Sequence, residues 1–143
     1  MAKEVKGFEA LKNQVEIVIT EEGLRIGLLE SENGTFFDSG KATPTKAGAE
    51  MLATLGENLG KLPNKVLVEG HTDARPYAGA RVYSNWELSA DRANAARRLM
   101  QASGLRPDQV IQVRGFADQQ LRKPEAPDDP SNRRVSILVR YVE

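Results

Sequence analysis

The sequence predicts an α/β fold of the α+β sandwich-like kind: a mixed sheet of strand–helix–strand units with helices packed on one side. Strand patterns alternate along the chain with two amphipathic helical segments, one over about 45–61 and one between Ser84 and Gly104. Such alternation implies crossover connections within one sheet and helices that cover at least one of its faces. Residues 66–68, VLV, are apolar at every position, which is typical of a strand buried in a parallel sheet.

Residues 15–28 are predicted to form a β-hairpin. Apolar residues occupy alternate positions over 15–19 and again over 24–28. Gly23 lies in the turn between these segments, and glycine adopts the positive φ that tight turns require. Before the hairpin, 4–13 has weak helical periodicity and is expected to form a short lead-in helix.

The first long helix is expected over about 45–61, after a loop at 30–41. Pro44 suits the first turn of a helix, where its missing N–H group costs nothing, and Thr43 is expected to cap that turn. Apolar residues recur along this segment at three- and four-residue spacing, which predicts one buried face. These residues are Met51, Leu52, Leu55, Leu59 and Leu62.

The second helix has the clearest start and stop signals in the chain. Ser84 and Glu87 have the spacing of a capping box, in which each side chain accepts a hydrogen bond from a main-chain N–H group at the helix start. Gly104 lies where a glycine commonly ends a helix. The helix is therefore expected to occupy most of the segment between them.

Two further strands complete the predicted sheet. Residues 110–114, VIQVR, follow the second helix and close a second strand–helix–strand unit. A long loop with three prolines is expected over 117–132. Apolar residues then alternate with other residues over 134–141, which predicts a last strand with one apolar face.

The composition excludes several classes of protein. Lysine plus arginine and aspartate plus glutamate both total 20, and the sequence pI is about 6.6, which argues against a nucleic-acid binder. The chain has no cysteine and one histidine, His71, so a thiolate zinc site is impossible and no metal or cofactor is expected. No run approaches the roughly 20 apolar residues of a membrane span.

A sequence echo brings two acidic residues to equivalent positions. VLVEGHTD (66–73) and IQVRGFAD (111–118) both run from a strand through a glycine to an aspartate. Asp73 and Asp118 therefore lie at matching offsets beyond two strand ends. Because ligand crevices in open α/β sheets lie outside the carboxyl ends of parallel strands, both acids are candidate site residues.

Arg92 is the basic residue expected to face this crevice. It lies on the inward-facing row of the second helix, near the N-terminal end, where the macrodipole disfavours a cation and a nearby anion is needed. Two interpretations remain open: an internal ion pair with Asp73, or a zwitterionic ligand that bridges Asp73 and Arg92. Arg133 has the inward parity of the last strand and would reach the same crevice if that strand runs antiparallel to 66–70.

Catalysis is the weaker interpretation of the same acids. Asp73 and Asp118 could form a glycosidase-like pair, which requires carboxyl groups roughly 5–9.5 Å apart. Nothing in the sequence indicates that one of the two has a raised pKa, and no nucleophile motif accompanies His71. His71 is therefore expected to be a structural residue, and no catalytic residue is predicted.

The motifs GHTD, SNWELSADRANAARRL, VRGFAD and PSNRRVSILV resemble the OmpA-like peptidoglycan-binding domain, in particular the periplasmic domains of MotB-type flagellar motor stator proteins. The resemblance covers nearly the whole chain from about Val15. It implies that 15–143 form one OmpA-like domain with a mixed sheet, and that 1–14 are a linker remnant or the short lead-in helix. It also implies a periplasmic location.

The same resemblance implies a binding site for the diaminopimelate residue of the peptidoglycan stem peptide. Asp73 and Arg92 match the family positions that hold the free zwitterionic end of that residue. The longer loop 74–83 departs from the family pattern, so no role is implied for its residues. The rest of the site is implied to comprise Thr72, Asn85, Leu88, Arg133 and, from a loosely aligned loop, Asp38.

The implied function is non-catalytic anchoring of a flagellar motor stator to the cell wall. The resemblance further implies a homodimer, and a full-length protein that spans the inner membrane and pairs with a MotA-like membrane subunit. Two alternatives remain open: a peptidoglycan hydrolase that uses Asp73 and Asp118, and a structural dimerisation module in which Asp73 and Arg92 pair with each other.

Overall fold

The computed structural model describes residues 12–32, 34–76 and 83–142. Its elements follow in the order η1 (Lys12–Gln14), β1 (Val15–Ile19), β2 (Gly23–Leu29), α2 (Lys46–Leu59), β3 (Val66–His71), α3 (Asn85–Ala102), η2 (Pro107–Gln109), β4 (Val110–Gly115), η3 (Pro130–Asn132) and β5 (Arg134–Arg140). None of the helices in these ranges has the length and apolar character needed to cross a membrane.

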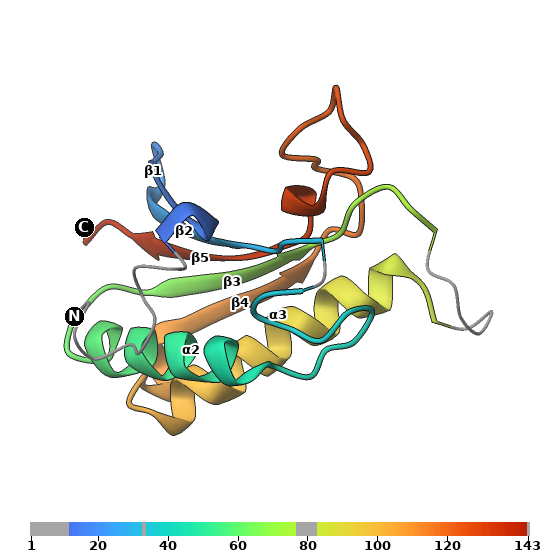
Figure 1. Cartoon of the computed structure of the whole chain (residues 1–143). Coiled ribbons are helices and arrows are strands. Elements are labelled where there is room, and N and C mark those ends of the chain that lie inside the picture. The colour runs from blue at the N-terminus through green and yellow to red at the C-terminus, as the bar shows by residue number, and fades with distance from the viewer. Residues whose placement is uncertain (1–11, 33, 77–82, 143) are drawn as a thin grey trace.

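The five strands form one mixed sheet in the order β1-β2-β5-β3-β4. β3 pairs with β4 in parallel and with β5 antiparallel, and the β1–β2 and β2–β5 pairs are antiparallel. Both α2 and α3 lie on one side of this sheet (Figure 1). The predicted fold class and the N-terminal hairpin are thereby confirmed, and the last strand runs antiparallel to β3, which was the condition for Arg133 to reach the crevice.

The core lies between the helices and one face of the sheet. Its largest wholly buried side chains include Phe36, Phe37, Leu52, Met100 and Ile137. The two phenylalanines come from the loop between β2 and α2, so that loop is fastened to the core rather than lying over it. The six residues of β3 are all buried, as expected for the run of apolar residues in a central strand.

Helix α3 lies directly against the carboxyl ends of β3 and β4 because each strand carries a glycine there. A Cβ atom at Gly70 would stand 1.9 Å from the carbonyl oxygen of Ser89, and one at Gly115 would stand 2.8 Å from the main-chain nitrogen of Ala90. Only glycine permits this approach. The repeated strand–glycine pattern therefore has a packing cause, and it brings the first turns of α3 next to Asp73.

The start of α2 differs from the prediction. Thr45 is its N-cap, and its hydroxyl accepts a hydrogen bond from the Gly48 N–H group, so the expected Thr43 cap and the helical Pro44 are wrong. Pro44 instead forms an isolated bridge with Phe37, and the Thr45 N–H group donates to the Phe36 carbonyl. These contacts hold the segment extended for two more residues than local sequence indicates.

The predictions for the N-terminal segment can be compared with the structure only in part. The expected lead-in helix at 4–13 falls mostly outside the described residues, and a 3-10 turn at Lys12–Gln14 precedes β1. The alternation of β1 is present, yet Ile17 and Ile19 are 62% and 77% exposed. β1 is an edge strand paired only with β2, which leaves its apolar side chains largely uncovered.

Candidate functional site

A cleft of about 400 Å³ lies where the end of β3, the start of α3, the loop before α2 and the start of β5 meet. The residues that line it include six of the seven predicted site residues: Thr72, Asp73, Asn85, Leu88, Arg92 and Arg133. The sequence-based prediction thus identifies one contiguous surface, built from side chains that are up to 61 positions apart in the chain.

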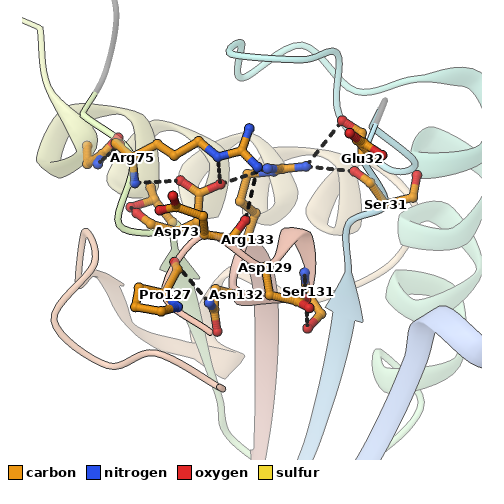
Figure 2. A network of polar contacts seen from close by, with 12 residues as sticks. Ser31, Glu32, Asp73, Arg75, Pro127, Asp129, Ser131, Asn132 and Arg133 are labelled. Carbon is orange, nitrogen blue, oxygen red and sulfur yellow. Dashed lines mark hydrogen bonds and ion pairs between the residues drawn. The ribbon is translucent and has the colours of Figure 1, made fainter. Parts of the chain in front are cut away.

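Asp73 and Arg133 form the central ion pair of this cleft. The guanidinium Nη1 of Arg133 donates to Oδ2 of Asp73 at 2.7 Å, and both side chains are largely buried. Nη2 of Arg133 donates to the Ser31 carbonyl at 2.7 Å (Figure 2). The antiparallel pairing of His71 with Arg134 explains this geometry, because it sets Arg133 beside the end of β3.

Arg92 does not pair with Asp73, which was the first of the two interpretations made for it. Its Nε donates to the Lys41 carbonyl at 2.7 Å, and its Nη2 donates to the Asp38 carbonyl at 3.1 Å. The guanidinium carbon lies 5.4 Å from the centre of the Phe37 ring, in a cation–π contact. The internal Arg92–Asp73 ion pair is therefore wrong, since Asp73 pairs with Arg133 and Arg92 is fastened to the 38–41 loop.

One nitrogen of Arg92 has no hydrogen-bond partner in the described part of the chain. The residue is 3% exposed, and its Nη1 is a buried donor without an acceptor. Burial lowers the pKa of Arg92 below its usual range, while the nearby carboxylate of Glu30 raises it. A buried donor of a charged group that lacks an acceptor is costly, which favours an anion arriving at this position.

Glu30 is a buried acid behind the cleft that the sequence analysis did not identify. Its carboxylate accepts hydrogen bonds from the N–H groups of Thr35 at 2.6 Å and Phe36 at 3.1 Å. Burial raises the pKa of Glu30, and these hydrogen bonds and the charges of Arg92 and Arg133 oppose that rise. Sequence alone offered no signal for it, because Glu30 follows a strand and begins an irregular loop.

Comparison with known proteins identifies the family of the chain that forms this cleft. A family model described as the OmpA family matches residues 36–135, which is more than half of the chain. The chain belongs to the OmpA family. The matched segment contains every residue that lines the cleft.

Two curated relatives and two solved structures illustrate the similarity of this OmpA-family chain. It is 42% identical over 133 residues to Motility protein B of Escherichia coli K12, covering 92% of this chain and 43% of the relative. It is 32% identical over 135 residues to Motility protein B of Bacillus subtilis 168, covering 90% of this chain and 49% of the relative. The chain thus spans less than half the length of these relatives.

The solved structures agree with the fold. The periplasmic domain of Helicobacter pylori MotB superposes with a TM-score of 0.76 at 20% identity, covering 90% of this chain and 89% of that one. The cell wall anchor of the type VI secretion system of Pseudomonas aeruginosa gives 0.75 at 25% identity, covering 99% and 96%. The predicted resemblance to OmpA-like domains of MotB type is thereby confirmed.

The remaining predicted residues occupy different parts of the OmpA-family cleft. The Thr72 hydroxyl donates to the Asp73 carbonyl at 2.8 Å, and the Asn85 side-chain amide donates to the Arg75 carbonyl at 2.8 Å. Leu88 is buried in the cleft wall. Asp38 is the exception: its side chain is exposed and does not line the cleft, and only its carbonyl contributes, through Arg92.

Asp118, the aspartate of the second strand–glycine–aspartate motif, lies outside the cleft. Asp118 is not among the lining residues, and its carboxylate accepts a hydrogen bond from the side chain of Gln119 at 3.0 Å. Asp73 is the one carboxylate among the described residues that line the cleft. The described residues that line the cleft therefore include no second carboxylate that could pair with Asp73 as in a glycosidase.

His71 has the surroundings of a structural residue. It is buried and stacks on Phe116, with ring centroids 4.9 Å apart and an interplanar angle of 12°. Burial, followed by the charges of Arg134 and Arg25, lowers the pKa of His71 to about 3. His71 does not line the cleft and is neutral near pH 7, which fits the predicted structural role.

Five lining residues were not predicted from the sequence: Ser39, Gly40, Lys41, Arg75 and Pro76. The first three come from the loop before α2, and the last two follow Asp73 in the loop that departs from the family pattern. No periodicity marks such positions, because their placement depends on how each loop folds back on the sheet.

Proposed function

We propose that this chain is a non-catalytic peptidoglycan-binding domain that holds the zwitterionic end of the diaminopimelate residue in the stem peptide. The observation that carries the proposal is a cleft with one carboxylate, Asp73, between guanidinium groups. A ligand with an ammonium and a carboxylate on one carbon is complementary to that arrangement. Membership of the OmpA family and the similarity to Motility protein B support the same ligand.

The ligand's carboxylate would be taken by Arg92, whose buried Nη1 has no acceptor in the described residues. Its ammonium would approach Asp73, which is oriented by Arg133 and by the Arg75 N–H group, a donor to Oδ1 at 3.1 Å. Leu88 offers an apolar wall for the methylene chain. Because loop carbonyls already hold the Arg92 guanidinium, little side-chain entropy remains to be lost on binding.

In the whole protein we propose that this domain anchors a flagellar motor stator to the cell wall from the periplasm. The domain would comprise 15–143, with 1–14 belonging to a linker. We further propose that the whole protein is a homodimer that spans the inner membrane and pairs with a MotA-like subunit. The similarity to proteins named Motility protein B supports a role in motility. A partly exposed charged site is expected to bind each stem peptide modestly, so two sites on one polymer would provide firm attachment.

Co-sedimentation with purified sacculi tests the proposal. Asp73→Asn keeps the shape of the side chain and removes its charge. We expect this variant to need at least about tenfold more protein than the parent for half-maximal binding to sacculi. Arg92→Ala should do the same. Asp118→Asn is the matched control, because it removes an equivalent strand-end acid outside the cleft, and it should sediment like the parent.

Two outcomes would overturn the proposal in different ways. Equal sedimentation of Asp73→Asn, Arg92→Ala and the parent would refute the assigned site. Release of soluble fragments from labelled sacculi by the pure parent domain, abolished in Asp73→Asn or Asp118→Asn, would establish a hydrolase instead. Circular dichroism of each variant checks that the fold is retained.

A further inference from the structure

We infer that Arg75 is a further ligand-binding residue, which contacts a second carboxylate of the ligand beyond its zwitterionic end. The inference rests on the proposed function and deepens it. It predicts that the cleft discriminates between ligands with one and with two carboxylates. Arg75 belongs to the loop after Asp73, for which the family resemblance implies no role.

The charges of the cleft exceed what a zwitterion can neutralise. Among the described lining residues, four are cationic, Lys41, Arg75, Arg92 and Arg133, and only Asp73 is anionic. The buried carboxyl group of Glu30 behind the cleft offsets at most one more positive charge. A ligand end with one ammonium and one carboxylate brings no net charge, so the excess of positive charge would remain. A second carboxylate reduces that excess, because opposite charges at close range in a partly buried site attract strongly.

The main chain of Arg75 is fixed at the edge of the cleft. Its N–H group donates to Oδ1 of Asp73, and its carbonyl accepts from the Asn85 side chain. The preceding N–H group, that of Ala74, donates to the Pro127 carbonyl at 2.9 Å. The position of Arg75 is therefore determined by β3, α3 and the 117–132 loop together.

The side chain of Arg75 is held over the cleft without a close ion pair. In Figure 2 it extends from the end of β3 across Asp73 towards Arg133. Its Nη2 donates to the Asp128 carbonyl at 3.1 Å, whereas its Nε lies 4.0 Å from Oδ2 of Asp73. That oxygen already accepts from Arg133 at 2.7 Å, so the charge of Arg75 is only weakly compensated within the described residues.

Arg75 is placed to bind a carboxylate at the rim of the cleft rather than the buried end of the ligand. Its side chain is 55% exposed, compared with 17% for Arg133. A planar guanidinium recognises a carboxylate with two parallel N–H groups, which a point charge cannot do. In partly exposed positions such a contact changes affinity by roughly five- to tenfold.

A pair of synthetic ligands tests this assignment by calorimetric titration. Both are meso-diaminopimelate acylated on one amino group, so that one zwitterionic end is free. In the first the carboxyl group of the acylated centre is a free carboxylate, and in the second it is a carboxamide. We expect the parent domain to bind the carboxylate about five- to tenfold more tightly than the carboxamide.

The variants separate Arg75 from the rest of the cleft. Arg75→Gln should bind both ligands equally, with the affinity that the parent has for the carboxamide. Arg98→Gln is the matched control, since it removes the same charge from an exposed residue of α3 outside the cleft, and it should discriminate like the parent. Asp73→Asn should lose both ligands.

The possible failures are distinct. Equal affinity of the parent for the two ligands, or discrimination that persists in Arg75→Gln, would overturn the role of Arg75 while leaving the proposed function intact. An equal weakening of both ligands in Arg75→Gln would also overturn it, because Arg75 would then act on the common zwitterionic end. Absence of binding of either ligand to the parent would refute the proposed function itself.

Discussion

Replacing Gly70 by alanine should destabilise the domain because α3 lies against β3 at this residue. The new Cβ atom would stand 1.9 Å from the carbonyl oxygen of Ser89, whereas ordinary contact begins at 3.4 Å. Relief requires α3 to move by about 1.5 Å, the difference between these distances. Such a shift opens the layer in which Ala96 and Met100 are wholly buried. Overpacking of a core costs about 1–3 kcal/mol, and we expect about 3 kcal/mol here because the obstructing atom belongs to the main chain.

Urea denaturation followed by circular dichroism measures this loss. Gly27→Ala is the matched control, because Gly27 is also a strand glycine and its nearest neighbour, an atom of the Leu29 side chain, would stand 3.6 Å away. The control should change the free energy of unfolding by less than about 0.5 kcal/mol. Equal unfolding midpoints for the two variants would refute the close approach of α3 to β3, and with it the account of how Arg92 comes to lie near Asp73.

Three further predictions concern the buried titratable groups and the cap of α3. Burial raises the pKa of Glu30 above its ordinary 4.5, so its contribution to stability is lost as pH rises from 4.5 through the folded-state value. Glu30→Gln should therefore gain stability relative to the parent over that range, and parallel urea midpoints between pH 4 and 7 would contradict this. For His71, whose pKa falls from 6.5 to about 3, the sign is opposite: the parent should lose stability as pH falls from 6.5 towards 3. His71→Phe, which can still stack on Phe116, should lose less stability than the parent over this pH range. An imidazole proton resonance of the parent that titrates near pH 6.5 would refute the lowered pKa of His71. Ser84→Ala removes the hydroxyl of the capping box and should cost about 1 kcal/mol by thermal unfolding. Ser103→Ala, at the other end of α3, removes a hydroxyl with no hydrogen bond in the described residues and should cost less than about 0.5 kcal/mol.

Features that depend on neighbouring residues could be predicted from the sequence. The capping box needs only Ser84 and Glu87, which are three residues apart, and the structure confirms both of its hydrogen bonds. The parity of the last strand sends Arg133 to the helix side and Arg134 to the other side, where Arg134 donates to the carbonyls of Asn132 and Gln120. The inward row of α3 likewise placed Arg92 in the buried layer.

Features that depend on contacts distant in sequence could not be predicted. Whether Asp73 pairs with Arg92 or Arg133 is decided by the register of β5 on β3, and two inward-facing guanidinium groups look alike in a sequence. The partners of Arg92 are carbonyl groups, which every residue has, so no residue type marks them. The N-cap of α2 moved from Thr43 to Thr45 for the same reason, because main-chain contacts with Phe36 and Phe37 decide it.

The path of loops explains the other unpredicted site residues. Glu30 becomes a buried acid only because the loop after β2 turns back and presents the N–H groups of Thr35 and Phe36 to it. Arg75 reaches the rim because the 117–132 loop supplies the Asp128 carbonyl. Asp38 is the opposite case. The loosely aligned loop suggested that its carboxylate belongs to the site, whereas the structure shows its main-chain carbonyl accepting a hydrogen bond from Arg92.

The cleft also ties ligand occupancy to folding of the whole chain. Arg133 donates to the carbonyl of Ser31, 102 positions away in sequence. The cleft is therefore lost if β2, β3, β5 and α3 separate. A ligand that binds only the folded state adds RT ln(1 + [L]/Kd) to the free energy of unfolding, about 2.7 kcal/mol at one hundred times Kd. A copy with an occupied cleft would therefore resist unfolding and proteolysis better than a copy with an empty one, so occupancy itself would lengthen the lifetime of the folded domain.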